Sequence, residues 1–133
     1  MSADYFFKLD GPLDSLPTER QMRIANLSGF QELVRNLGAD PRALLERHDI
    51  DPLALRDPDH YVDCKAVVDL FEHCGTSLNH PLFGLQLAQL QEPDVYGCVA
   101  ALCRAASSAR ESVVGFIDYL PVVHSPVSVM ELI

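Results

Sequence analysis

The sequence predicts a mainly α-helical domain, a compact bundle of about five to six short helices with a β-prone segment at its C-terminal end. Apolar residues recur at helical spacing in several short stretches, and most stretches begin at a capping residue and end at a glycine or a proline. In addition, 48% of the 133 residues are hydrophobic and 22% are charged. This composition is typical of one folded domain with a single hydrophobic core.

The chain divides into an extended N-terminal lead-in over residues 1–22 and a helical domain over residues 23–133. The lead-in contains Phe6, Phe7 and Pro12, and its glycine and prolines favour extended or turning backbone over helix. We expect the two phenylalanines to dock onto the core.

The first helix is predicted to begin at Ser28, because Ser28 and Gln31 have the spacing of a capping box. Apolar residues then recur at helical period, and Gly38 supplies the stop. A second helix is predicted from Asp40 as N-cap with Pro41 at the first helical position. A further short turn begins at 51–52, and residues 57–59 interrupt the helical structure again.

The most regular helix is predicted to begin at Asp63 and to end at Gly75. Its buried face is one apolar stripe made of Val67, Leu70, Phe71 and Cys74. Pro81 begins the next helix, which Pro93 prevents from continuing.

Small apolar residues dominate 97–106, which predicts a segment buried on most sides. Ser108 and Glu111 form a second capping box that begins the last helix, and Pro121 closes it. Residues 126–133 are β-prone, but a single strand has nothing else in this chain to pair with.

Charge and hydropathy exclude several classes of partner. The formal net charge is -9 and the pI is about 4.8, so the chain repels the phosphate backbone and is not expected to bind nucleic acid directly. No stretch approaches the ~20 consecutive apolar residues that cross a bilayer, and the N-terminus lacks the pattern of a signal peptide. We therefore expect a cytoplasmic protein without a membrane partner.

The cysteines and histidines do not have the spacing of a metal site. Cys98 and Cys103 are five residues apart, which places them about 140° from each other on a helix. His73 and Cys74 are adjacent and face different directions. We expect no metal and no disulfide, and we interpret the cysteines as small buried side chains in a reducing compartment: Cys64, Cys74, Cys98 and Cys103.

No catalytic constellation is found in the sequence. The nearest grouping joins Asp63, Cys64, His73 and Cys74, but ten residues or nearly three turns separate Asp63 from His73. The glycines occur singly, so neither type of phosphate-binding loop is present. We expect no catalytic residue, no cofactor and no enzyme activity.

Aromatic and hydroxyl groups gather near the C-terminal end of the predicted bundle. Tyr96, Phe116 and Tyr119, together with Cys98, combine apolar surface with hydroxyl groups, as the walls of small-ligand pockets do. The same residues also suit an ordinary helical core. Tyr96, Phe116 and Tyr119 are the candidate ligand-binding residues.

The order of these signals resembles the N-terminal regulatory domain of AraC-type transcriptional regulators, in the branch whose domain is called arabinose-binding-type. The resemblance covers about Asn26 to Leu132. Its first half is carried by the segments 29–34, 38–45 and 51–52. Its second half is carried by 80–85, which is similar to the family's aspartate-proline-x-phenylalanine-glycine-leucine step, by Tyr96-Gly97, which is similar to its glycine turn, and by the serine-capped helix in 107–119.

The resemblance implies an effector-sensing and dimerisation module. In the family, this module leads into a β-rich sensor region, which the strand from Val127 would begin, and a C-terminal domain with two helix-turn-helix motifs binds promoter DNA. No such motifs follow in the 133 residues. The expected partners are a small-molecule effector and a second copy of the chain, with DNA bound only through the absent domain.

Two other hypotheses for the function remain open. A stand-alone protein-interaction module would bind a partner through an exposed apolar surface and need no small molecule. A small acidic hydrolase would need a reactive, solvent-accessible thiol at Cys98 or Cys103.

Overall fold

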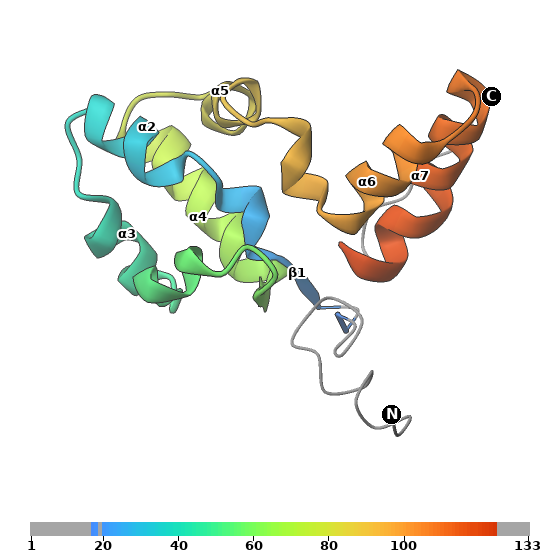
Figure 1. Ribbon diagram of the computed structural model, residues 1–133. Helices are drawn as coiled ribbons and strands as arrows, with labels where there is room; N and C mark the ends of the chain where they lie inside the picture. Colours follow the sequence, from blue (N-terminus) through green and yellow to red (C-terminus); the bar gives the residue numbers. More distant parts are fainter. Residues whose placement is uncertain (1–16, 19, 125–133) are drawn as a thin grey trace.

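The computed structural model of the chain describes residues 17–18 and 20–124 (Figure 1). Most of the expected lead-in, including Phe6 and Phe7, and the β-prone segment 126–133 lie outside the described residues.

The described residues form six α-helices, three 3-10 helices and one two-stranded antiparallel sheet, which confirms a mainly α-helical fold. In chain order they are β1 (Gln21–Arg23), η1 (Ile24–Leu27), α2 (Phe30–Asn36), α3 (Pro41–Arg47), η2 (Pro52–Arg56), β2 (Tyr61–Asp63), α4 (Cys64–Ser77), α5 (Phe83–Gln89), η3 (Pro93–Tyr96), α6 (Cys98–Ala105) and α7 (Ala109–Val123).

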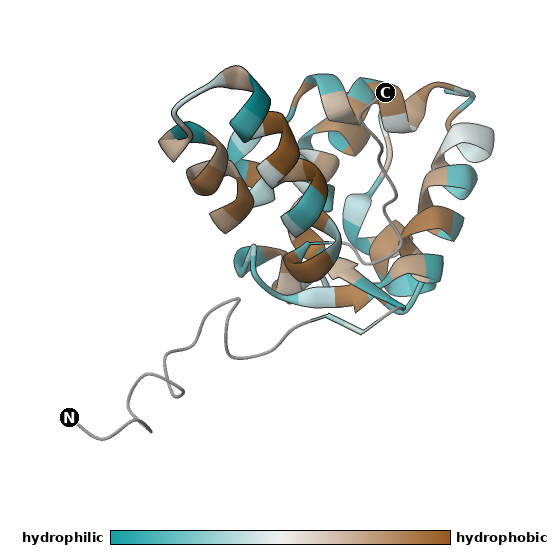
Figure 2. Ribbon diagram, turned by 90° about the vertical axis from the view of Figure 1, so that its right-hand side faces the viewer, coloured by the Kyte–Doolittle hydropathy of each residue, from teal (hydrophilic) through white to brown (hydrophobic). Residues whose placement is uncertain are grey.

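The elements form two groups that η3 joins (Figure 1). Helices α2 to α5 gather with η1 and η2 into a body, and α6 packs against α7 as a helical hairpin beside it. Brown and teal segments alternate along the helices in Figure 2, as expected where one stripe of each helix is buried.

The core of the body is centred on aromatic contacts between α2, α4 and α5. The rings of Phe30 and Phe83 meet edge to face with centroids 5.8 Å apart, and Phe71 lies 5.9 Å from Phe83. Aliphatic side chains from η1 and α2 to α5 complete this core, and the predicted stripe of α4 contributes Val67, Leu70 and Cys74.

The small sheet was not expected from the sequence. β1 pairs with β2 so that Gln21 lies opposite Asp63 and Arg23 opposite Tyr61. The strand β1 crosses the predicted boundary at residue 22, so the end of the lead-in contributes to the folded domain. Three-residue strands are too short to show the alternation that identifies a strand.

At four of the predicted beginnings, the side chain of the first residue caps the helix or turn. The side chain of Asp40 accepts a hydrogen bond from the backbone N–H of Arg42 at 3.0 Å, and that of Asp51 accepts from Leu53 at 2.9 Å. The Asp63 side chain caps α4 at 3.2 Å, and the Ser108 hydroxyl caps α7 at 3.1 Å. Each bond satisfies a backbone donor that the first helical turn leaves unpaired.

The predicted beginnings of α2 and α5 are wrong. Ser28 makes no side-chain cap, because Gly29 is the N-cap residue of α2 with a positive φ of 81°. Helix α5 begins at Phe83 rather than at Pro81, and Leu82 is its N-cap residue.

Two predicted helix ends are also wrong. Helix α4 passes through Gly75 to Ser77, and the Gly75 carbonyl accepts a hydrogen bond from the N–H of His80 at 2.8 Å as the chain folds back. Helix α7 continues through Pro121 to Val123. Pro121 lacks one N–H donor, but burial of Leu120 and Val123 holds this last turn in place.

The prediction that 97–106 is buried on most sides is wrong as well. Only Val99 and Ala100 of this segment are buried, whereas Leu102 is 44% exposed. Helix α6 is therefore an amphipathic surface helix whose one buried face meets α7 and η3.

Candidate functional site

A pocket of about 430 Å³ lies between η3, α6 and α7. We call it the hairpin pocket, and its lining residues are Pro93, Tyr96, Ala100, Cys103, Arg104, Ser112, Val113 and Phe116. Its volume falls within the range of small-molecule sites, and most of its wall is apolar.

Two aromatic rings from different elements form one side of this pocket. Tyr96 ends η3 and Phe116 lies in the middle of α7, and their rings meet edge to face with centroids 5.0 Å apart. Aromatic pairs prefer this geometry because the positive edge of one ring faces the negative face of the other. The contact ties η3 to the hairpin.

The loop between α6 and α7 is fixed by polar contacts close to the pocket. The carboxylate of Glu111 accepts a hydrogen bond from the backbone N–H of Ser107 at 2.8 Å, which with the Ser108 cap forms a capping box shifted by one residue. The thiol of Cys103 donates to the Ser112 carbonyl at 3.4 Å. These bonds hold the two helices at a short separation.

An ion pair lies at the edge of the pocket. Arg104 of α6 pairs with Asp94 of η3, and their side chains are 61% and 77% exposed. A pair so exposed contributes little to stability. It leaves one cation and one anion next to an otherwise apolar wall.

The structure brings two of the three candidate ligand-binding residues together. Tyr96 and Phe116 both line the hairpin pocket, but Tyr119 does not line it, and its side chain is 52% exposed. Cys98, which the sequence grouped with them, is exposed at the beginning of α6. A role in ligand binding stays a prediction for all three aromatic residues.

Sequence reasoning missed part of the pocket wall. Ala100, Cys103 and Val113 also line the pocket, but they are not among the candidate ligand-binding residues that the sequence predicts. Their helical spacing could have placed them together, but spacing does not show whether a cavity or a neighbouring helix faces that side.

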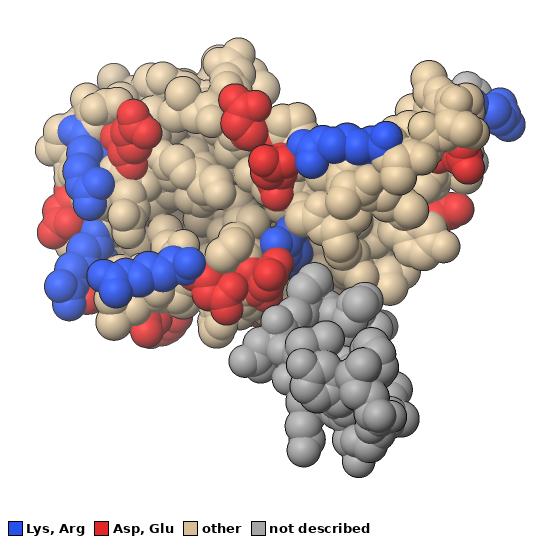
Figure 3. Space-filling model, in the orientation of Figure 1, with Lys and Arg blue, Asp and Glu red and all other residues tan. Residues whose placement is uncertain are grey.

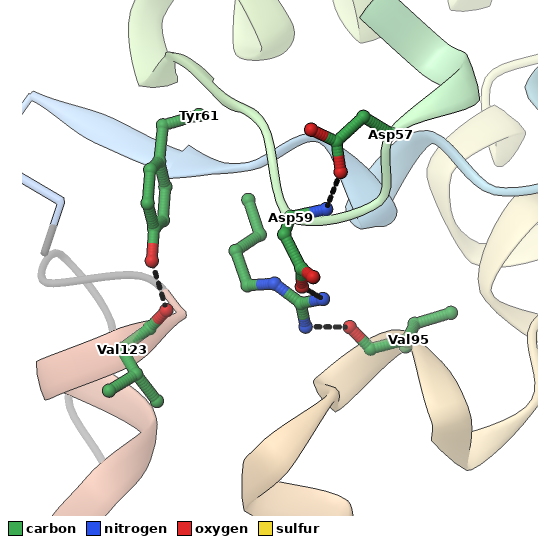
Figure 4. A network of polar contacts seen from close by, with 6 residues as sticks. Asp57, Asp59, Tyr61, Val95 and Val123 are labelled. Atoms are coloured by element: carbon green, nitrogen blue, oxygen red, sulfur yellow. Dashed lines mark hydrogen bonds and ion pairs between the residues drawn. The ribbon is translucent and has the colours of Figure 1, made fainter. Parts of the chain in front are cut away.

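Tyr96 is positioned by a buried arginine in β1. The Arg23 side chain is 4% exposed, pairs through Nη2 with Asp59, and donates from Nη1 to the carbonyl of Val95 at 2.9 Å. Asp59 is itself held by a bond from its backbone N–H to the carboxylate of Asp57 at 3.0 Å (Figure 4). The guanidinium thus fixes η3, and with it Tyr96, against β1 and the 57–60 loop.

Gly97 makes room for this guanidinium. A Cβ atom at Gly97 would lie 2.8 Å from Cζ of Arg23, and the backbone there has a positive φ of 56°. Both the close approach and the conformation require glycine.

The C-terminal end of α7 is attached to the sheet. The hydroxyl of Tyr61 donates to the carbonyl of Val123 at 2.9 Å (Figure 4), and the backbone N–H of Arg23 donates to the carbonyl of His124 at 2.9 Å. We call the contacts of Arg23, Asp59, Tyr61 and His124 the clasp, because they join η3 and α7 to the body.

His124 is a neutral, buried member of the clasp. It is 2% exposed, and Nε2 donates to Oδ1 of Asn26 at 3.0 Å, since a carbonyl oxygen can only accept. Its Nδ1 has no partner among the described residues. Burial, together with the charge of Arg23, lowers the pKa of His124 to about 4.

The nucleophilic and metal-ligating side chains of the described residues are dispersed. Burial raises the pKa of the Cys74 thiol to about 11, so this thiol stays protonated. His48 and His73 share a hydrogen bond of 2.8 Å, but the described residues hold no group of three or more metal-ligating side chains. The mostly apolar wall of the hairpin pocket suits binding of an apolar molecule.

In the part of the chain that the structure describes, none of the helices has the length and apolar character needed to span a membrane.

Comparison with known proteins places the chain in a family. The family described as "Arabinose-binding domain of AraC transcription regulator, N-term" matches residues 38–132. The chain is also 36% identical over 105 residues to the HTH-type transcriptional regulator VirS from two strains of Mycobacterium tuberculosis. The match covers 79% of this chain and 31% of the regulator, so the chain spans about a third of the length of these relatives. The chain belongs to the family of N-terminal, arabinose-binding-type regulatory domains of AraC transcription regulators.

Proposed function

We propose that this domain senses a small-molecule effector for an AraC-type transcription regulator, and that the hairpin pocket receives the effector. The observation that carries the proposal is the pocket itself, an apolar space of about 430 Å³ with the Tyr96–Phe116 pair on one side. The family label names arabinose, but an apolar wall favours a ligand with more apolar surface than a sugar has.

Such a domain acts by changing the arrangement of its structural elements, and this action needs no chemical reaction. An effector that contacts η3, α6 and α7 together favours the arrangement of these elements that it fits best, and shifts the population toward it. We infer that DNA is bound by a part of the regulator outside these 133 residues. The net charge of -9 supports this assignment, because it opposes direct contact with phosphates.

We also infer that the hairpin contributes to self-association. It exposes five large apolar side chains, and its surface in Figure 3 carries few charges. They are Leu102, Val113, Val114, Tyr119 and Val122. The same surface favours the alternative function, a protein-interaction module without a small ligand. Sedimentation equilibrium of the isolated chain, with and without ligand, distinguishes an effector-sensing domain from a protein-interaction module that needs no small ligand.

Binding of anilinonaphthalene sulfonate, a fluorescent probe of apolar cavities, tests the proposed pocket. We compare the natural chain with Val113→Glu, which adds a carboxylate to the wall, and with Val114→Glu, its neighbour outside the wall. The two valines are 43% and 38% exposed, so both changes leave the core intact. We expect Val113→Glu to weaken binding by about tenfold, because desolvating an unpaired carboxylate is unfavourable, and Val114→Glu to leave it unchanged.

Equal binding by the three proteins would show that the probe does not occupy the hairpin pocket and would overturn the proposal. Tyr119→Ala is a further control in the same titration, because the ring of Tyr119 lies outside the wall of the hairpin pocket. In an intact regulator, Phe116→Ala that destabilised the fold without changing effector-dependent transcription would count against the pocket.

A further inference from the structure

A second hollow lies on the other side of Tyr96, where α7 meets the body. We call it the junction cleft. It measures about 370 Å³ and is lined by Met22, Asn26, Val67, Val68, Phe71, Gly84, Leu87, Ala88, Gln91, Tyr96, Leu120 and His124. It therefore draws on β1, η1, α4, α5 and α7, and shares one side chain, Tyr96, with the hairpin pocket.

The lining of the junction cleft specifies an uncharged ligand. None of its lining residues is Asp, Glu, Lys or Arg. A charged group entering the cleft would lose water without meeting a counter-charge, which is strongly unfavourable. Val67, Leu87 and Leu120 instead offer apolar contacts from three different helices.

The polar groups of the cleft are mostly engaged with one another. The amide of Gln91 donates to the carbonyls of Asn26 and Ser28, at 2.8 and 3.0 Å. The Oδ1 atom of Asn26 accepts from His124, and its Nδ2 contacts the sulfur of Met22 at 3.4 Å. These bonds make the polar end of the cleft rigid.

One acceptor is left over. His124 lines the cleft, its Nε2 is bonded to Asn26, and its Nδ1 is buried without a partner among the described residues. Buried polar atoms in folded proteins nearly always have partners. A hydroxyl group satisfies this acceptor, because it has one hydrogen-bond donor.

We propose that the junction cleft binds a small uncharged molecule that has an apolar body and one hydroxyl group, such as a phenol or an aliphatic alcohol, whose hydroxyl donates to Nδ1 of His124. This site is separate from the hairpin pocket, and the proposal does not depend on the function assigned to that pocket. Its ligand contacts the body through Val67 and Leu87 and the hairpin through Leu120.

The test uses three probes that share one methyl-substituted ring. Para-cresol carries the hydroxyl, para-methylanisole replaces it with a methoxy group that cannot donate, and para-toluate replaces it with a charge. Methyl-resolved NMR titrations of the whole chain report both the affinity and the location. We expect para-cresol to shift the methyl signals of Leu87 and Leu120 and to bind at least about fivefold more tightly than para-methylanisole. We expect para-toluate to cause no shift.

Two variants that replace an alanine with phenylalanine test where the probe binds. Ala88 is exposed and lines the cleft, so Ala88→Phe fills its mouth without disturbing the core. Ala101 is an exposed alanine of α6 that lines neither the cleft nor the hairpin pocket, so Ala101→Phe adds the same ring elsewhere. We expect Ala88→Phe to abolish the para-cresol shifts and Ala101→Phe to retain them.

A third variant tests the acceptor, and three results would overturn the proposal. We expect His124→Phe to bind para-cresol and para-methylanisole equally; if this variant does not fold, the alanine pair still decides the location. Equal affinities of the two probes for the natural chain would remove the hydroxyl assignment. Shifts confined to Val113, or para-cresol shifts that survive Ala88→Phe, would show that the cleft is not the site.

Discussion

Arg23 shows how one buried cation positions the candidate site. Its guanidinium contacts two segments that are distant in sequence from its own strand, the loop at Asp59 and the end of η3 at Val95. Asp59 stays 40% exposed and keeps part of its hydration, which limits the desolvation cost of the pair. The arginine therefore acts mainly by fixing where η3, and hence Tyr96, lies.

Replacing Gly97 with alanine tests this positioning. The added Cβ would collide with the Arg23 guanidinium, and alanine disfavours the positive φ. Gly38 is the matched control, because its φ is 82° but nothing lies within 4 Å of its Cβ position. We expect Gly38→Ala to lower the free energy of unfolding by about 1 kcal/mol, and Gly97→Ala by about 3 kcal/mol. Urea denaturation measures both, and equal losses would contradict a role for the collision.

The sequence grouped Tyr96 with Phe116, which the structure brings together, but it did not indicate their neighbours in space. On α7, Phe116 and Leu120 are four residues apart and share a face, which leaves Tyr119 at the exposed side. The sequence alone does not show whether position 119 or 120 faces inward, because both are apolar or aromatic. It also gave no signal for Arg23, since a single arginine is usually a surface residue and Asp59 lies 36 positions away.

The two predicted capping boxes, which begin at Ser28 and Ser108, differ in the structure. Ser108 caps α7 through a hydrogen bond from the N–H of Glu111, whereas Ser28 makes no cap and lies before Gly29. We expect Ser108→Ala to lower the free energy of unfolding by about 1 kcal/mol, because it leaves a helix donor unpaired. We expect Ser28→Ala to change it by less than about 0.5 kcal/mol. Thermal or urea denaturation of both variants checks this, and a loss of similar size in both would contradict the assignment of the caps.

Helix beginnings were largely predictable from the sequence, while several ends were not. Caps such as Asp40 and Asp63 act over three residues, so their signal is local. The ends of α4 and α7 depend on tertiary contacts: the return of the chain at His80 and the burial of Leu120 and Val123. The pairing of β1 with β2 joins segments about forty residues apart, and no local pattern specifies it.

Burial of a neutral histidine makes the stability of the domain depend on pH. His124 has a pKa of about 4 in the folded chain, against about 6.5 when the chain is unfolded. Between these values the unfolded chain binds more protons, so the stabilisation is complete above pH 6.5 and is lost as the pH falls toward 4. His73, whose pKa is lowered by burial and by Arg47 and His48, changes stability in the same direction.

We expect this shift to account for about 3 kcal/mol of the free energy of unfolding between pH 6.5 and pH 4. The variant His124→Gln removes the titrating group. Its free energy of unfolding should therefore depend less steeply on pH in this interval, whatever its stability at pH 7. Urea denaturation of both proteins at a series of pH values gives the two slopes. Parallel slopes would mean that His124 titrates as it does in the unfolded chain.

The clasp also bears on the order in which the molecule folds. The Asn26–His124 bond joins residues 98 positions apart, whereas most other contacts of the body lie within or between neighbouring helices. Closing a loop of this length costs about 4 kcal/mol of chain entropy before any contact compensates for it. The body and the hairpin are therefore expected to form early from local contacts, and the clasp to close last. By the same reasoning it opens first, so its amide hydrogens should exchange with solvent through partial openings that leave both helical groups folded.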